Sequence, residues 1–136
     1  MSIETKGIKV RYNWLRFMYV VNIFYALGIG LGLLIVPNTM MSLFGYSVSE
    51  LVWSSYGPSY MVALGLLCIV ALRSPVKFSL LLVVQAITKI VWILAIAVPG
   101  LLAGTLPTFG LILCALFVPV IIGDVIAVPW RQIIEK

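Results

Sequence analysis

The sequence contains no histidine, only four acidic residues and only two cysteines among its 136 residues. The missing histidine removes the commonest general base, the commonest transition-metal ligand and the usual axial ligand of haem. Metal centres and Ser/His or Cys/His catalytic pairs are therefore not expected. The sequence predicts no catalytic residue, no metal site and no bound cofactor, and it favours a role that is not enzymatic.

Charge of either sign is also scarce: charged residues make up 10% of the chain, whereas hydrophobic residues make up 63%. A soluble domain of this length shows far more polar surface to water, so the composition indicates an integral membrane protein. The net charge of +5 does not indicate nucleic acid. The basic residues other than Lys89 lie at the chain ends and in one short loop, and they form no basic stripe with interleaved aromatic residues.

Four apolar stretches are long enough to cross a hydrocarbon core about 30 Å thick, which takes about 20 helical residues. They cover approximately residues 17–36, 53–72, 78–98 and 107–128. Lipid cannot satisfy exposed backbone polar groups, and the stretches lack the alternation of barrel strands, so each is predicted to be a helix. The connections are short, which makes consecutive helices antiparallel neighbours. The predicted fold class is all-α, a single transmembrane domain over residues 1–136 folded as an antiparallel four-helix bundle.

The basic residues outside these spans all fall on one side of the predicted bundle. The loops over residues 37–52 and 99–106 contain no lysine or arginine. Because basic residues concentrate in the cytoplasmic loops of multi-pass proteins, both termini are predicted to be cytoplasmic. The membrane is the inner or plasma membrane if the source is bacterial. The residues concerned are Lys6, Lys9, Arg11, Arg16, Arg73, Lys77, Arg131 and Lys136.

Lys89 interrupts the third apolar span, "LLVVQAITKIVWILAIAV", near the middle of the membrane. A lone lysine at that depth costs about 3 kcal/mol or more, so a partner is expected. Asp124 is the only acidic residue inside any span, and it lies about 9 Å from Lys89 along the membrane normal. Helical side chains lean toward their own N-terminus, so on antiparallel helices these two lean toward each other.

Other polar residues fall in the same half of the membrane. Gln85 lies one helical turn before Lys89, and Asn22 lies about 8 Å deep in the first span. Thr88 is expected to bond its own backbone and to stay apart from them. The sequence therefore predicts one polar cluster, whose members are Asn22, Gln85, Lys89 and Asp124.

Three interpretations of this cluster stay open at the level of sequence. It is either a structural ion pair that fixes the register of the helices, or a site for an anionic headgroup, a quinone-like carbonyl or a proton. In the third interpretation, Lys89 pairs with a carboxylate on another subunit.

Small residues in the first span predict close helix contacts, either within one chain or between chains, because lipid gives helices no hydrophobic reason to associate. Ala26 and Gly30, and likewise Gly28 and Gly32, are spaced four residues apart on the first helix. The segment "MMSLF" in the first loop is either a short helix in the membrane interface or an ordinary loop. Cys68 and Cys114 are predicted to lie at different depths and to remain unbonded.

Two segments, "YALGIGLGLLIVPNTMMSLFGY" and "YGPSYMVALGLLCIVALRSP", resemble the first half of DoxX-like four-helix membrane proteins. The order of features is shared: a glycine-rich helix, a proline, a short outer segment, and a helix of small residues before an Arg-x-Pro type loop. The resemblance implies an antiparallel four-helix bundle, in a family that includes accessory subunits of membrane oxidoreductases. It supplies no functional residues.

These observations predict a small polytopic membrane protein that acts as a non-catalytic accessory or structural subunit of a larger membrane complex. The alternative is a self-contained carrier or enzyme that binds a lipid or a quinone at the Lys89/Asp124 cluster. The expected partners are the lipid bilayer and either other membrane subunits or further copies of the chain.

Overall fold

The computed structural model describes the backbone of residues 4–5, 8–43 and 51–134, and the side chains of residues 10–43 and 56–134. Within these ranges the chain is helical, apart from turns and a short hairpin of β1 (Glu4–Thr5) and β2 (Ile8–Lys9). The predicted all-α class is therefore confirmed. Lys6 and Lys136, which contribute to the predicted orientation, lie outside the described residues.

Among the described residues, three helical stretches are long and apolar enough to cross a membrane: Tyr12–Ile35, Leu80–Leu102 and Thr108–Ala127. The second predicted span corresponds to a helix whose described apolar part, Tyr56–Ala71, is shorter. The helices are α1 (Tyr12–Ile35), α2 (Pro37–Leu43), α3 (Leu51–Ala71), α4 (Leu80–Trp92), the π-helical turn η1 (Ile93–Ala97), α5 (Val98–Leu102), α6 (Thr108–Ala127) and α7 (Trp130–Ile134).

The first helix begins five residues before the predicted span. The apolar window locates the part of a helix that suits lipid, but the backbone continues to hydrogen-bond beyond it. In the added turn, the Trp14 indole Nε1 donates a hydrogen bond to the Gly123 carbonyl at 3.1 Å, and the Arg16 guanidinium lies 4.7 Å from the centre of the Tyr12 ring. The first contact holds the added turn against α6, and the second links two side chains on the surface of α1 itself.

The third span continues past Pro99, where the sequence predicts that a loop begins. Proline has no backbone N–H and normally ends or kinks a helix. Here the preceding turn, η1, is wide: the Val98 N–H bonds the Ile93 carbonyl five residues back. A π-helical turn of this kind absorbs the disruption, so the helix runs on through α5 to Leu102.

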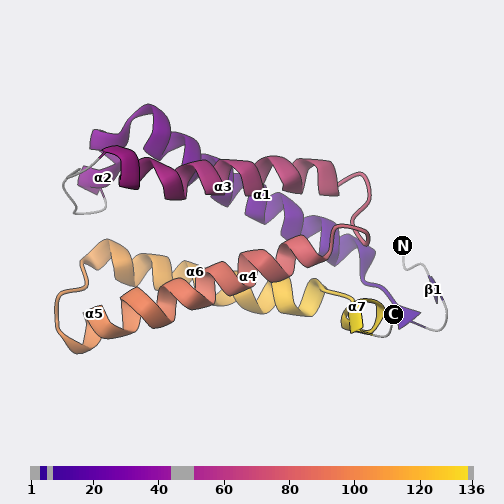
Figure 1. Cartoon of the computed structure of the whole chain (residues 1–136). Coiled ribbons are helices and arrows are strands. Elements are labelled where there is room, and N and C mark those ends of the chain that lie inside the picture. Colours follow the sequence, from indigo (N-terminus) through magenta and orange to yellow (C-terminus); the bar gives the residue numbers. More distant parts are fainter. Residues whose placement is uncertain (1–3, 6–7, 44–50, 135–136) are drawn as a thin grey trace.

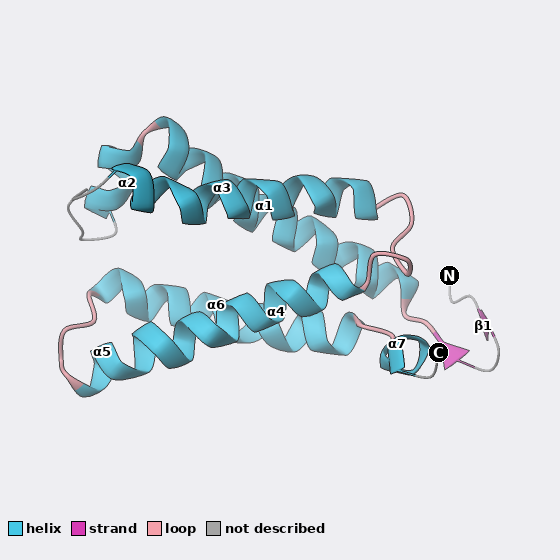
Figure 2. Ribbon diagram, viewed as in Figure 1, coloured by secondary structure: helices cyan, strands magenta, loops and turns pink. Residues whose placement is uncertain are grey.

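The long helices form two antiparallel pairs, α1 with α3 and α4 with α6, and α1 also contacts α6 (Figure 1). The starts of α1 and α4, the ends of α3 and α6, and α7 meet at one end of the molecule. The other end holds α2 and α5, and there the two pairs stand apart (Figure 2).

The buried core occupies the end where both termini lie. It contains Leu15, Met18, Tyr19, Cys68, Ala71, Leu82, Ala127 and Val128, which come from α1, α3, α4, the last residue of α6 and the residue that follows it. The Tyr19 hydroxyl donates a hydrogen bond of 2.9 Å to the Pro75 carbonyl and ties the 72–79 turn to α1. This end is therefore closed, whereas many large apolar side chains along the outer faces of the helices are exposed.

Glycine permits the close approach of α1 and α3 at Gly30. A Cβ atom placed there would lie 3.0 Å from Val62 Cγ2 and 3.1 Å from the Pro58 carbonyl oxygen, so a larger residue has no space. The predicted small face is confirmed at Ala26 and Gly30, which are buried. At Gly28 nothing lies within 4 Å of the Cβ position, so this glycine makes no close contact with another described helix of the same chain, and a contact between chains stays a prediction.

The short segment after α1 is helical. α2 begins at Pro37 and ends at Leu43, so the part of "MMSLF" that the structure describes forms a helix and not an irregular loop. Met40 packs on Gly32, whose Cβ position lies 2.9 Å from the Met40 Cε atom. Gly32 therefore serves the contact between α1 and α2, and not a contact with another long helix.

Candidate functional site

Four polar side chains are buried together where α1, α4 and α6 meet. The exposed fractions of these residues are 0% for Asn22, 6% for Gln85, 4% for Lys89 and 0% for Asp124. All four residues that the sequence predicts for the polar cluster are therefore brought together. We refer to Asn22, Gln85, Lys89 and Asp124 as the Lys89 cluster.

Asn22 stands between the two charges and contacts both. Its carbonyl Oδ1 accepts a hydrogen bond of 3.0 Å from Lys89 Nζ. Its amide Nδ2 donates to Asp124 Oδ1 at 2.7 Å and to the Met18 carbonyl at 3.0 Å. An amide suits this place because it offers an acceptor to the cation and a donor to the anion at the same time.

The ammonium group of Lys89 has three close acceptors. Besides Asn22, Nζ donates to the backbone carbonyl and to Oε1 of Gln85, both at 3.2 Å. Asp124 Oδ2 lies 3.8 Å from Nζ, which is an ion pair but too long for a hydrogen bond. The counter-charge of Lys89 thus belongs to the same chain, and the cluster as a whole is electrically neutral.

The helices place these groups by simple geometry. Gln85 and Lys89 are four residues apart on α4 and share one face. Lys89 leans toward the start of α4 and Asp124 toward the start of α6, so on antiparallel helices the axial gap between them closes. Thr88 is exposed and donates to its own backbone at the Val84 carbonyl, 2.8 Å away, as the sequence predicts.

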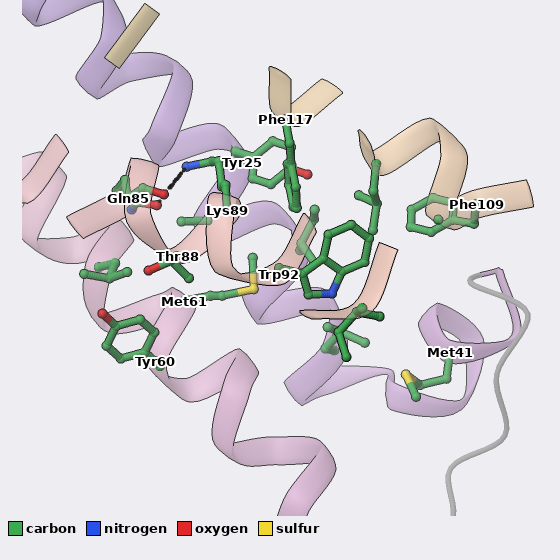
Figure 3. Close-up of a pocket in the computed structure, with 17 residues that line it drawn as sticks. Tyr25, Met41, Tyr60, Met61, Gln85, Thr88, Lys89, Trp92, Phe109 and Phe117 are labelled. Atoms are coloured by element: carbon green, nitrogen blue, oxygen red, sulfur yellow. Dashed lines mark hydrogen bonds between the residues drawn. The ribbon is translucent and has the colours of Figure 1, made fainter. Parts of the chain in front are cut away.

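A pocket of about 530 Å³ extends from the Lys89 cluster between the two helix pairs (Figure 3). This volume lies within the range of about 300–1,000 Å³ that is typical of sites for small organic ligands. The polar residues of its wall are Tyr25, Tyr60, Gln85, Thr88 and Lys89. The remaining lining is apolar: Ala26, Ile29, Leu33, Met41, Met61, Leu64, Trp92, Ile96, Phe109, Gly110, Leu113 and Phe117.

Aromatic rings form the wall of the pocket next to Lys89. The Phe117 ring lies 5.4 Å from the Tyr25 ring and 5.3 Å from the Trp92 ring, the latter edge-on. Lys89 Nζ lies 6.0 Å from the centre of the Tyr25 ring. The buried Tyr25 hydroxyl has no hydrogen-bond partner among the described residues, and neither has Gln85 Nε2. This end of the pocket therefore lies beside buried polar atoms whose hydrogen-bonding capacity is not used by the described residues.

Sequence reasoning missed this aromatic wall. Tyr25, Trp92 and Phe117 come from three different helices, and each lies in an apolar run. In such a run, the sequence does not distinguish a ring that lines a pocket from a ring that faces lipid. Their spacing from the polar residues carries a weak signal, since Trp92 follows Lys89 by three residues and Tyr25 follows Asn22 by three. That spacing places each ring on the same helix face as a member of the Lys89 cluster.

The two cysteines are free, as predicted. Cys68 is fully buried in the core, and Cys114 is half-buried on α6. Among the described residues, no group of three or more His, Cys, Asp or Glu side chains is placed to hold a metal ion.

Comparison with known proteins gives no relative from which a function can be read. Neither protein-family models, nor curated proteins, nor solved structures match this chain. The resemblance to DoxX-like proteins stays a prediction, and the function has to be inferred from the geometry of the site.

Proposed function

We propose that this protein is a multi-pass membrane protein that binds an amphipathic molecule in the pocket beside the Lys89 cluster. One observation carries the proposal: the pocket has an apolar wall over most of its length and hydrogen-bonding groups gathered at one end. A site with this distribution fits a molecule that has an apolar body and a single polar head. The head would lie against Lys89, Gln85 and Tyr25, and the apolar part would extend toward α2 and α5.

The environment of Lys89 supports binding more than a purely structural role. An ion pair that only fixes helix register needs no space beside it, yet Lys89 and Gln85 line a pocket of about 530 Å³. Ionisable residues inside a membrane commonly mark the paths or sites of ligands. The role of accessory subunit stays a prediction, and no contact in the described residues favours it over ligand binding.

Four spans with both termini in the cytoplasm are part of this proposal. The elements that carry Lys9, Arg11, Arg16, Arg73, Lys77 and Arg131 all lie at the closed end of the molecule (Figure 1). Positive residues gathered at one end support a cytoplasmic location for that end.

Single cysteines introduced into two exposed turns test this orientation, in a background with Cys114→Ala. We expect Ser74→Cys, in the 72–79 turn, to react with a membrane-impermeant maleimide only after the vesicles are opened. Thr105→Cys, between α5 and α6, should react in intact right-side-out vesicles. The reverse pattern would show that the orientation is inverted, and labelling of both from the same side would exclude the four-span topology.

Native mass spectrometry of the protein released from detergent micelles tests the binding function. We expect the wild-type protein to carry a bound amphipathic molecule from its membrane, and Leu113→Trp to lose it, because the indole fills the pocket. Leu116→Trp is the matched control, since this side chain lies on the same helix but is 49% exposed and outside the pocket. Equal retention by both variants would contradict binding in this pocket.

A further inference from the structure

We infer that the occupant of the pocket is an uncharged lipid of low polarity, with a single carbonyl or hydroxyl head, that resides in the interior of the bilayer. The inference rests on the proposed binding function and specifies its ligand class. Three features of the site carry it: the charge balance of the Lys89 cluster, the direction in which the pocket changes polarity, and the position of its opening.

The charge balance disfavours an anionic head. Lys89 is compensated by Asp124 at 3.8 Å and already donates to Asn22 and Gln85. An anion beside Lys89 would bring a second negative charge close to Asp124, in a region without water to screen it. An uncharged carbonyl or hydroxyl adds no net charge beside this ion pair.

The direction of the polarity gradient disfavours a phospholipid. Lys89 lies nine residues into the helical stretch Leu80–Leu102, about 14 Å from its start and near its middle. From there the pocket runs past Ile96 to Phe109, at the end of the molecule that holds α5. The polar end of the pocket is therefore deep in the span and the apolar end is nearer a membrane surface, opposite to the arrangement in a phospholipid leaflet.

A phospholipid would have to place its phosphate near the middle of the membrane in order to reach Lys89. A lipid with one weakly polar, uncharged head has no such obstacle, since it already distributes into the bilayer interior.

The opening of the pocket suits entry from the bilayer. Tyr60 on α3 and Thr88 on α4 both line the pocket, yet Tyr60 is 43% exposed and Thr88 is also exposed. The pocket is thus open between α3 and α4 at the depth of Lys89. The opposite side, between α1 and α6, is closed by the Asn22–Asp124 hydrogen bond and the contact between the Tyr25 and Phe117 rings.

Two probes with the same brominated chain test the ligand class. Methyl 9,10-dibromostearate has a neutral ester head, and 9,10-dibromostearate at alkaline pH has a charged head. Bromine quenches nearby tryptophan, and Trp92 lines the pocket, so the difference between wild-type protein and Trp92→Phe reports occupancy. We expect the ester to quench Trp92 at a concentration roughly tenfold or more below that of the carboxylate, because a charge in this site is costly.

Asp124→Asn tests the reason for this preference. The variant leaves Lys89 without its counter-charge, so we expect the preference to shift toward the carboxylate probe. A folded Asp124→Asn protein with an unchanged ratio would overturn the charge argument. If this variant fails to fold, the comparison of the two probes on the wild-type protein decides the inference.

The outcomes separate the inference from the proposed function. Equal or stronger quenching of the wild-type protein by the carboxylate would overturn the neutral-lipid inference and leave binding in the pocket intact. If neither probe quenches Trp92, the inference is wrong. The mass spectra of the wild-type protein and Leu113→Trp then show whether binding in the pocket fails as well.

Discussion

Lys89→Met is expected to lower the free energy of unfolding by about 3–5 kcal/mol, because it leaves the Asp124 carboxylate buried without its cation. Asp124 is 0% exposed and keeps only the hydrogen bond from Asn22 once the ammonium group is gone. The loss should appear as a lower melting midpoint in detergent. Asp124→Asn should be destabilising for the same reason, since it leaves the buried ammonium group without a counter-charge.

The double variant, Lys89→Met with Asp124→Asn, should recover much of the loss. Removing both charges of a buried pair is often nearly neutral, whereas removing one charge is not. The recovery is measured as non-additivity of the three changes in stability. If the two single losses simply add, the charges do not interact in the folded protein, and Lys89 must find its partner elsewhere.

Asn22→Leu is expected to cost about 3 kcal/mol, because one substitution removes a hydrogen bond from each of two charged groups. Lys89 Nζ loses the acceptor at 3.0 Å and Asp124 loses the donor at 2.7 Å, while both charges stay buried at a separation of 3.8 Å. Leucine is branched at the same carbon as asparagine but offers neither a donor nor an acceptor. The effect is measured as the change in melting midpoint or in the denaturant concentration at half unfolding.

Thr88→Val is the matched control for Asn22→Leu. It also replaces a polar side chain by an apolar one at similar depth, but the Thr88 hydroxyl bonds only the Val84 carbonyl of its own helix. Its effect should be less than about 0.5 kcal/mol. Equal losses for Asn22→Leu and Thr88→Val would contradict the role of Asn22 as the bridge between the charges.

The local sequence specifies where most helices of this protein begin and end. The apolar runs predict α6 to within one residue at each end, because a continuous lipid-compatible run between prolines and polar loops leaves few alternatives. The prediction is wrong at Pro99, where a proline predicts a loop and the π-helical turn η1 carries the helix onward. Such a turn depends on the backbone relaxing around the proline, which residue type alone does not specify.

The membership of the Lys89 cluster could also be predicted. Few polar residues lie in the spans, and a polar side chain inside the membrane needs another polar group as its partner. Depth along a helix follows from residue count, and the lean of helical side chains brings Lys89 and Asp124 toward the same level. The sequence does not specify which group contacts which. That Asn22 stands between the charges, and not beside them, depends on how α1 is rotated against α4 and α6.

The pocket was decided by tertiary structure alone. Its wall combines residues from six elements, α1, α2, α3, α4, η1 and α6, and it lies between the two helix pairs. An apolar side chain that faces this space is indistinguishable in sequence from one that faces lipid, since both environments are apolar. Hydrophobicity along the chain thus determines which segments are helices, whereas the packing of the two helix pairs determines where the pocket lies.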